Sequence, residues 1–302
     1  MRWIRSARTA LVALEMFAGP VSGFLWGATG SGVAPVDFLP LPALRISGEP
    51  ARAHTQGLEI VGNRYFVTAR REDGGQRRAL LLQWSSGDSN WSTWNLTPPG
   101  APTMDHPGGM QADGRRLWIP LSESRKNGKS VVRAYSVEGW TPGRIPAPEV
   151  EFAVDDHIGA VAVLAGRWLL AGASWDTETV YLWDFSGAEK QVLRGAALSR
   201  LGLGPGTRDD PGLRVQDWKG TTDGLVASGL FSTGGVSSPS VSRVLILGDS
   251  LSSPPVLLPL PSVAGVELAR EAMAVHDGCL WFLPEDLGET NRLIRLPMPK
   301  AP

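Results

Sequence analysis

The sequence has little of several features that would make a function easy to assign. Its 302 residues include one cysteine, Cys279, so no intramolecular disulfide can form and the fold must be held by its core. Lysine plus arginine number 29 against 30 for aspartate plus glutamate, and no long run of one charge provides the basic face that nucleic acids require. The chain also lacks a glycine-rich phosphate loop with its lysine and the Gly-x-Ser-x-Gly turn of serine hydrolases. These absences argue against nucleic-acid binding and against two common classes of enzyme.

Long apolar runs are missing after the first thirty residues. Three arginines among the first eight residues precede a largely apolar stretch over residues 9–30, which is typical of a secretory signal or an N-terminal anchor. Glu15 places a charge in this stretch and Pro20 would break a helix there. We therefore predict a signal-like or anchoring segment over residues 1–35, with a flexible extension as the alternative, and a single domain over residues 36–302. The prediction for the localisation is an exported protein: periplasmic, extracellular or membrane-tethered.

A short polar phrase recurs along the rest of the chain. Each occurrence has a cluster of polar residues, then small or apolar residues, then a strand that ends in an aromatic residue or, in some repeats, in an apolar one. The phrase occurs at His54, His106 and His157, and less similar copies occur at Gln216 and Ala269. Successive copies lie 51 to 59 residues apart. Internal repeats of this length indicate propellers or solenoids.

Each repeat can be divided into four short strands that are bounded by glycine and proline. In the first repeat these are residues 57–61, 65–69, 79–84 and 91–96. The last repeat is one strand short, whereas residues 41–46 form an extra strand before the first repeat. We therefore predict an all-β, five-bladed β-propeller that is closed by this N-terminal strand in the last blade, because closure removes open sheet edges. A sandwich or an open solenoid is the alternative.

The candidate site follows from the symmetry of a propeller, which gathers equivalent positions of the repeats around the central channel. Three of the four histidines of the chain occupy the same position of consecutive repeats. Their neighbours supply carboxylates and amides at or near that position. The candidate residues are His54, His106 and His157 at the first position with Gln216 in the fourth place, Gln56 and Glu271 two residues along, Asp105 and Asp156 before their histidines, and Asp217 beside Gln216.

Three interpretations of this set remain open. In the first, the three histidines bind a divalent transition metal such as zinc, Asp105 and Asp156 orient their rings, and Glu271 moves a proton of a metal-bound water. In the second, no metal takes part: the site captures a polar ligand, or Glu271 acts as a general acid or base, because burial in a narrow channel can raise the pKa of a carboxyl group. In the third, the polar residues only satisfy hydrogen bonds at the channel mouth.

The phrases at residues 54–58, 105–109 and 156–160 resemble those of an uncharacterised family of bacterial five-bladed β-propeller proteins. The resemblance covers roughly residues 45–296. More distantly, the Thr-Gln-Gly-Leu run at residues 55–58 is similar to the Phe-Thr-Gln-Gly phrase of plant-type glutaminyl-peptide cyclotransferases, which implies the same fold. The chain departs from that phrase, since His54 stands where those enzymes have an aromatic residue. A shared fold does not by itself assign an activity.

Together these features predict a propeller protein with a polar, histidine-rich site at the channel mouth, acting as a metal-dependent hydrolase or a related acyl-type enzyme. The first alternative is a non-catalytic propeller that binds a small ligand or a protein. The second is an aminoacyl transferase similar to glutaminyl cyclases. The sequence leaves open whether the protein is an enzyme. We expect a monomer whose partner is a small-molecule ligand or substrate rather than nucleic acid.

Overall fold

The computed structural model of the chain describes residues 36–73, 75–206, 212–233, 236–237, 243–247, 255–260, 263 and 266–298. The predicted signal-like or anchoring segment lies outside these ranges, so export, tethering and the proposed domain boundary stay predictions. Within the described ranges, no helix is both long enough and apolar enough to cross a membrane.

The described chain is built almost entirely of antiparallel strands, and most of them pair with the strand next to them in sequence. The first three sheets begin at the three repeats that carry the histidines, and each contains four strands in consecutive order, with an extra short strand, β9, in the second. Their strands are β4 (His54–Val61), β5 (Arg64–Asp73), β6 (Gln76–Ser85) and β7 (Ser92–Asn95); β8 (His106–Pro107), β9 (Gln111–Ala112), β10 (Arg116–Ser122), β11 (Ser130–Ser136) and β12 (Val150–Val154); and β13 (Ile158–Leu164), β14 (Leu169–Ser174), β15 (Thr179–Asp184) and β16 (Glu189–Arg194).

The remaining sheets follow the same plan. One has the order β17-β18-β20-β21 with the short β19 paired to β18, and the last has the order β1-β24-β23-β22. Their strands are β17 (Gly212–Thr221), β18 (Gly224–Thr233), β19 (Val236–Ser237), β20 (Arg243–Leu247) and β21 (Val256–Pro259), then β22 (Ala272–His276), β23 (Cys279–Leu283), β24 (Asn291–Pro297) and β1 (Asp37–Leu41). Short helical turns lie between strands: η1 (Ala165–Arg167), η2 (Trp175–Thr177), α1 (Ala196–Ser199) and η3 (Leu268–Arg270).

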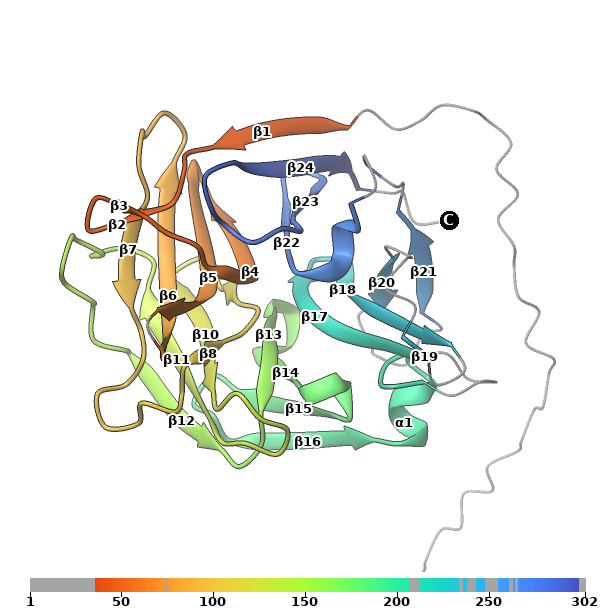
Figure 1. The fold of residues 1–302 in the computed structure, drawn as a ribbon. Coiled ribbons are helices and arrows are strands. Elements are labelled where there is room, and N and C mark those ends of the chain that lie inside the picture. The colour runs from red at the N-terminus through yellow and green to blue at the C-terminus, as the bar shows by residue number, and fades with distance from the viewer. Residues whose placement is uncertain are drawn as a thin grey trace, which may run out of the picture. The chain divides into compact units, whose positions relative to one another are not determined.

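An N-terminal strand completes the last sheet, as predicted, but it overlaps the predicted segment only at Leu41. Strand β1 pairs antiparallel with β24 and lies at the outer edge of that sheet (Figure 1). The predicted segment, residues 41–46, instead leads into a hairpin, in which β2 (Arg45–Ile46) pairs with β3 (Glu49–Pro50). The chain can reverse there because Ser47 and Gly48 both have positive φ. The apolar residues of the segment are still buried, since Leu44 is 1% exposed and donates its N–H to the carbonyl of Gly288 in the last repeat.

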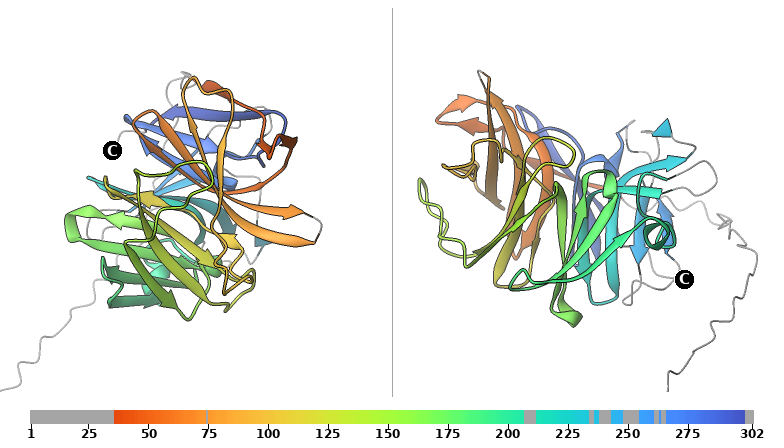
Figure 2. Two further views of the ribbon diagram at one scale, coloured as in Figure 1. Left: turned by 90° about the vertical axis from the view of Figure 1, so that its left-hand side faces the viewer. Right: turned by 90° about the horizontal axis from the view of Figure 1, so that it is seen from below.

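The sheets surround a common centre in a propeller-like arrangement (Figures 1 and 2). The strands that open the repeats lie innermost, and contacts between them link β4 to β22, β17 and β9, and β13 to β17 and β9. The hydrophobic core is divided into clusters, and each cluster joins two neighbouring sheets. One cluster combines Leu58 and Leu82 of the first sheet with Ala274 and Leu283 of the last. This packing between sheets, rather than within one face, is what the repeat period of the sequence predicts.

A buried ion pair lies among the inner strands. The Asp217 carboxylate is fully buried and accepts the backbone N–H groups of Leu58, Trp218 and Met273, while its Oδ1 lies 2.5 Å from Lys219 Nζ. Lys219, itself 2% exposed, also donates to the carbonyl of Met110 at 2.7 Å. Three sheets and the segment that leads into β9 of a fourth therefore meet at one pair of side chains. Buried charges of this kind are found where each has a partner, as here.

Two glycines allow the inner strands to approach this centre. A Cβ atom on Gly109 would lie 2.5 Å from Asp217 Oδ1, and one on Gly108 would lie 2.2 Å from the carbonyl oxygen of Gly159. Gly109 also pairs with Ala160 through a parallel bridge between the second and third sheets. The pair Gly108 and Gly109, which follows Pro107, is therefore needed for close contact between strands rather than for a turn.

Candidate functional site

A β-bulge recurs at the start of three inner strands and defines which residues are equivalent. The bulged residue is Gln56 in β4, Gly159 in β13 and Gln216 in β17. Two residues before the bulge lie His54, His157 and, in β17, Arg214. The prediction that Gln216 takes the place of a histidine in the fourth repeat is therefore wrong by two residues. Gln216 is the counterpart of Gln56, and Arg214 is the counterpart of the histidines.

His54 lies between two carboxyl groups. Its Nδ1 is 2.7 Å from Asp286 Oδ1 in the loop between β23 and β24, and its Nε2 is 3.9 Å from Glu271 Oε2. The hydrogen bond to Asp286 raises the pKa of His54, against the opposing effect of burial. Since Asp286 fixes one ring nitrogen, the other nitrogen is directed toward Glu271.

Glu271 is a buried carboxyl group directly before β22, with 8% of its surface exposed. Burial raises its pKa to about 7, and the charges of His54 and Arg270 oppose that shift. The gap of 3.9 Å to His54 Nε2 is longer than a hydrogen bond, so one polar ligand atom can lie between the two groups and contact both. Glu271 and His54 therefore form a pair that can exchange protons near neutral pH.

His106 is held by protein groups at both ring nitrogens. Its Nε2 lies 2.8 Å from Gln56 Oε1, and its Nδ1 lies 3.3 Å from Arg70 Nη1 and 3.4 Å from Ser124 Oγ. Because Arg70 can only donate, Nδ1 is the acceptor and Nε2 carries the proton. Burial, followed by the charges of His157 and Arg70, holds the pKa of His106 well below its usual value. His106 is thus a neutral ring in one tautomer.

His157 contacts His106 and completes an aromatic wall. The rings of His106 and His157 lie 5.1 Å apart between centroids, and the Trp175 ring lies 4.7 Å from His157, both in edge-to-face geometry. His157 Nδ1 donates to the carbonyl of Glu123 at 2.7 Å, which leaves Nε2 as the acceptor, and burial lowers the pKa of the ring. Trp175 begins a turn in which Asp176 and Thr177 both have positive φ, a costly conformation for a β-branched residue.

The predicted aspartates have three different environments. Asp105 Oδ1 accepts a hydrogen bond from Ser124, the hydroxyl that also lies near His106. Asp156 accepts the backbone N–H of His157 and the hydroxyl of Tyr181, so it fixes the start of β13 rather than a histidine ring. Asp217 belongs to the buried ion pair among the inner strands. Ligand binding by these residues stays a prediction.

The hydrogen bonds bear directly on the predicted metal site. Within the described ranges, no group of three or more histidine, cysteine, aspartate or glutamate side chains is arranged to hold a metal ion. His106 would have to release either Gln56 or Arg70 to offer a lone pair, whereas His157 Nε2 is free to do so. Zinc binding by His54, His106 and His157 therefore stays a prediction, and it requires a rearrangement of His106.

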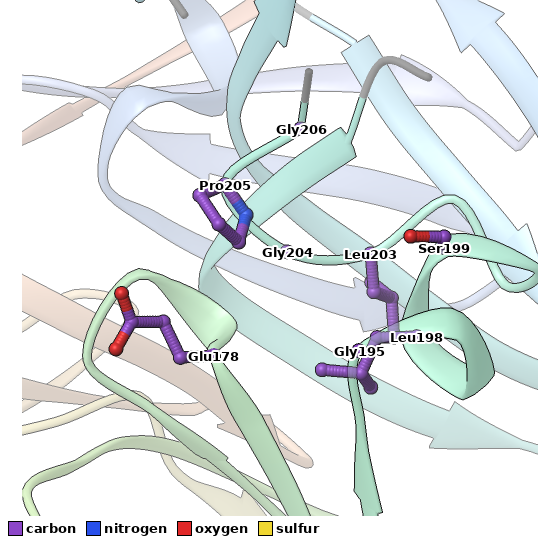
Figure 3. A pocket seen from close by; sticks show the side chains of 8 residues that line it. All are labelled: Glu178, Gly195, Leu198, Ser199, Leu203, Gly204, Pro205 and Gly206. Atoms are coloured by element: carbon purple, nitrogen blue, oxygen red, sulfur yellow. The ribbon is translucent and has the colours of Figure 1, made fainter.

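A small cavity of about 210 Å³ lies beside the turn that carries Trp175. Figure 3 shows Glu178 on one side of this cavity, with Leu198 of α1 and the segment from Leu203 to Gly206 opposite. Glu178 Oε1 is 2.6 Å from Lys126 Nζ. None of the predicted site residues lines this cavity, so it is separate from the histidine cluster.

Sequence reasoning missed the residues that hold the histidines. Asp286, Ser124 and the carbonyl of Glu123 lie in loops outside the repeated phrase. Arg70 could have been found, because it lies directly opposite His54 across the β4–β5 hairpin. No equivalent signal exists for Asp286, which is 232 residues from His54 in the sequence.

Comparison with known proteins gives a family match over part of the chain but no activity. Residues 85–203 match a family of unknown function (DUF6454). The matched region contains Asp105, His106, Asp156 and His157 of the candidate site. No curated protein matches the chain.

Solved structures with a similar fold include proteins of unrelated roles. One comes from work on the GH130 family of mannoside phosphorylases, which contains glycoside hydrolases that target β-1,2 mannosidic linkages in Candida mannan; it is 11% identical over 83% of this chain and 86% of that one, with a TM-score of 0.48. A glycosyl hydrolase from Bacteroides ovatus is 11% identical over the same shares, with a TM-score of 0.44. The WD40 repeats of RRP9 are 12% identical over 88% of this chain and 99% of that one, with a TM-score of 0.47. Similarity at this level supports no argument about substrate.

Proposed function

We propose that the channel mouth binds a small polar molecule and catalyses its hydrolysis by acid–base chemistry, with Glu271 and His54 as the proton-transferring pair. The observation that supports this proposal is a buried carboxyl group facing a histidine whose other nitrogen is held by Asp286. His54 Nε2 takes a proton from water, and Asp286 stabilises the resulting imidazolium through Nδ1. Glu271, with a pKa raised to about 7, gives a proton to the leaving group.

The other two histidines take a positioning role in this proposal. His106 and His157 are neutral rings with fixed tautomers, so they offer shape and directed hydrogen bonds rather than mobile protons. Trp175 extends the wall that they form. We further propose that the sheets are five blades of a propeller, because the described strands form five sheets of four or five strands, each with the opening strand of its repeat innermost.

A non-catalytic ligand-binding propeller is the second candidate function. It is favoured by the same two rings, whose pKa values are lowered by burial and which are therefore uncharged at neutral pH. Such a site would select a ligand by shape and hydrogen bonds alone.

A substrate panel with matched variants tests the proposal. The purified full chain is incubated at pH 7 with aryl esters, lactones and aryl glycosides. We expect turnover of at least one class, and a loss of about 10²–10⁴-fold in kcat for Glu271→Gln. Glu285→Gln is the control, since its exposed side chain lies next to Asp286 in sequence, and it should retain full activity. Equal activity of the wild type and Glu271→Gln would contradict acid–base catalysis, and binding without turnover would favour the second candidate.

A further inference from the structure

A second cavity lies away from the histidine cluster, on the outer side of the first sheet. Its volume is about 730 Å³, within the range of small-molecule pockets. The β2–β3 hairpin, the β5–β6 hairpin and β7 enclose it, and Figure 1 shows these elements close together. None of the channel-mouth residues lines this cavity.

The lining of this cavity is cationic. Three arginines, Arg45, Arg71 and Arg78, contribute to it, and no aspartate or glutamate does among the side chains that the structure describes. The described partners of two of them are neutral: Arg45 Nη1 donates to the carbonyl of Gly48, and Arg78 Nη2 donates to Gln76 Oε1. Guanidinium groups in such surroundings are suited to bind carboxylate or phosphate oxygens.

Two of these arginines lie in an unfavourable arrangement. Arg71 and Arg78 are directly opposite each other across the β5–β6 ladder. Like charges at this position destabilise a strand pair. Burial lowers the pKa of Arg71, and the charge of Arg78 lowers it further. The ladder thus brings two guanidinium groups together at one wall of the cavity, where one anion can contact both.

Neutral polar groups complete the lining. Asn90, Ser92, Thr93 and Asn95 face the same cavity. Thr93 Oγ1 is buried and has no hydrogen-bond partner among the described residues. The lining thus combines cations with amides and hydroxyls, which is the donor set that a hydroxylated anion needs.

We propose that this cavity binds a small, soluble, hydroxylated oxyanion of the sugar-phosphate class, with its charged group on Arg45, Arg71 and Arg78 and its hydroxyl groups on the amides and hydroxyls of β7. The site is independent of the acid–base pair. Loss of Glu271 leaves it intact, so the two proposals fail separately.

Calorimetric titration of the full chain tests this site. We expect glucose 6-phosphate to bind with one-to-one stoichiometry, more tightly than inorganic phosphate, and glucose not to bind. Arg45→Gln and Arg78→Gln should each weaken binding about tenfold, as expected for the loss of a charge-assisted hydrogen bond of about 1.4 kcal/mol. Arg115→Gln is the control, because this exposed arginine pairs with Glu149 on another sheet, and it should bind normally.

The unliganded variants provide a second readout. Arg78→Gln removes the repulsion with Arg71, so its melting temperature should equal or exceed that of the wild type while its affinity falls. Three results would overturn the proposal: no saturable binding of glucose 6-phosphate, equal affinity for inorganic phosphate, or unchanged affinity in both arginine variants. Binding to phosphatidylglycerol vesicles without binding of the soluble anion would also overturn it, since it would assign the arginines to a lipid surface.

Discussion

Replacing Lys219 by methionine should destabilise the protein strongly. Lys219 Nζ is 2.5 Å from Asp217 Oδ1 and 2.7 Å from the carbonyl of Met110, and the two charged side chains are 2% and 0% exposed. Methionine keeps the length of the side chain but removes the charge, so Asp217 stays buried with only backbone N–H donors among its described partners. Breaking a buried pair in this way costs about 3–5 kcal/mol, a large part of the free energy of unfolding of an ordinary domain.

The same substitution at the surface provides the control. Lys190 pairs with Asp184 at 2.7 Å, but Lys190 is 48% exposed, so Lys190→Met should leave the free energy of unfolding unchanged within error. Urea denaturation followed by circular dichroism measures both variants against the wild type. Equal effects of the two substitutions would refute the structural role of the buried pair.

The pH dependence gives this prediction a second test. Burial raises the pKa of Asp217 to about 6, and the charge of Lys219 opposes that shift. Without Lys219 the pKa of Asp217 should rise further. The folded variant then binds a proton on Asp217 more tightly than the unfolded chain does. The stability lost in Lys219→Met should therefore be smaller at pH 5 than at pH 8. A loss that does not decrease in acid would mean that the charge of Asp217 is not what destabilises the variant.

Three further predictions follow from the inner strands and from the closing strand. Gly109→Ala should destabilise the protein by roughly 1–3 kcal/mol in urea denaturation, since its Cβ would overlap Asp217, whereas Gly166→Ala, with open space around it, should be neutral. Burial raises the pKa of Glu59 from 4.5 to about 7, so the folded state binds its proton more tightly and stability falls as the pH rises through this window. Glu59→Gln should flatten that part of the stability curve, and an unchanged slope would argue against a titrating Glu59. Deleting residues 1–41 removes β1 from the last sheet and should lower the melting temperature, whereas deleting residues 1–35 should not. Equal melting temperatures for the two truncations would contradict closure by β1.

The repeated phrase is enough to predict strands that surround a centre and histidines that gather at one mouth. His106 and His157 do meet, and Glu271 does face His54. The register of the fourth repeat could not be predicted, because a shift of two residues leaves the inward and outward alternation of a strand unchanged. Only the bulge at Gln216 shows that Arg214 is the equivalent of the histidines.

The partners of the site were beyond prediction for a different reason. Asp286 reaches His54 from a loop of the last repeat, and loops carry no periodic signal. The buried pair could have been suspected, since Lys219 stands in an apolar inner strand and shares a face with Asp217 two residues earlier. The closing strand was misplaced by a few residues. Leu41 and Leu44 are both buried, but only Leu41 belongs to β1. The pattern of apolar residues shows that both are buried and does not show which of them pairs with another strand.

Titration of Glu271 tests the proposed acid–base pair most directly. The carboxyl carbons of the full chain are labelled with ¹³C, and comparison with Glu271→Gln assigns the signal of Glu271. We expect this signal to titrate with a pKa of about 7, because the carboxyl group is buried. We also expect His54→Gln to raise that pKa, since the charge of His54 opposes the shift. A pKa near 4.5, the ordinary value of a glutamate, would show that Glu271 is solvated and ionised at neutral pH, and would contradict its role as the proton donor.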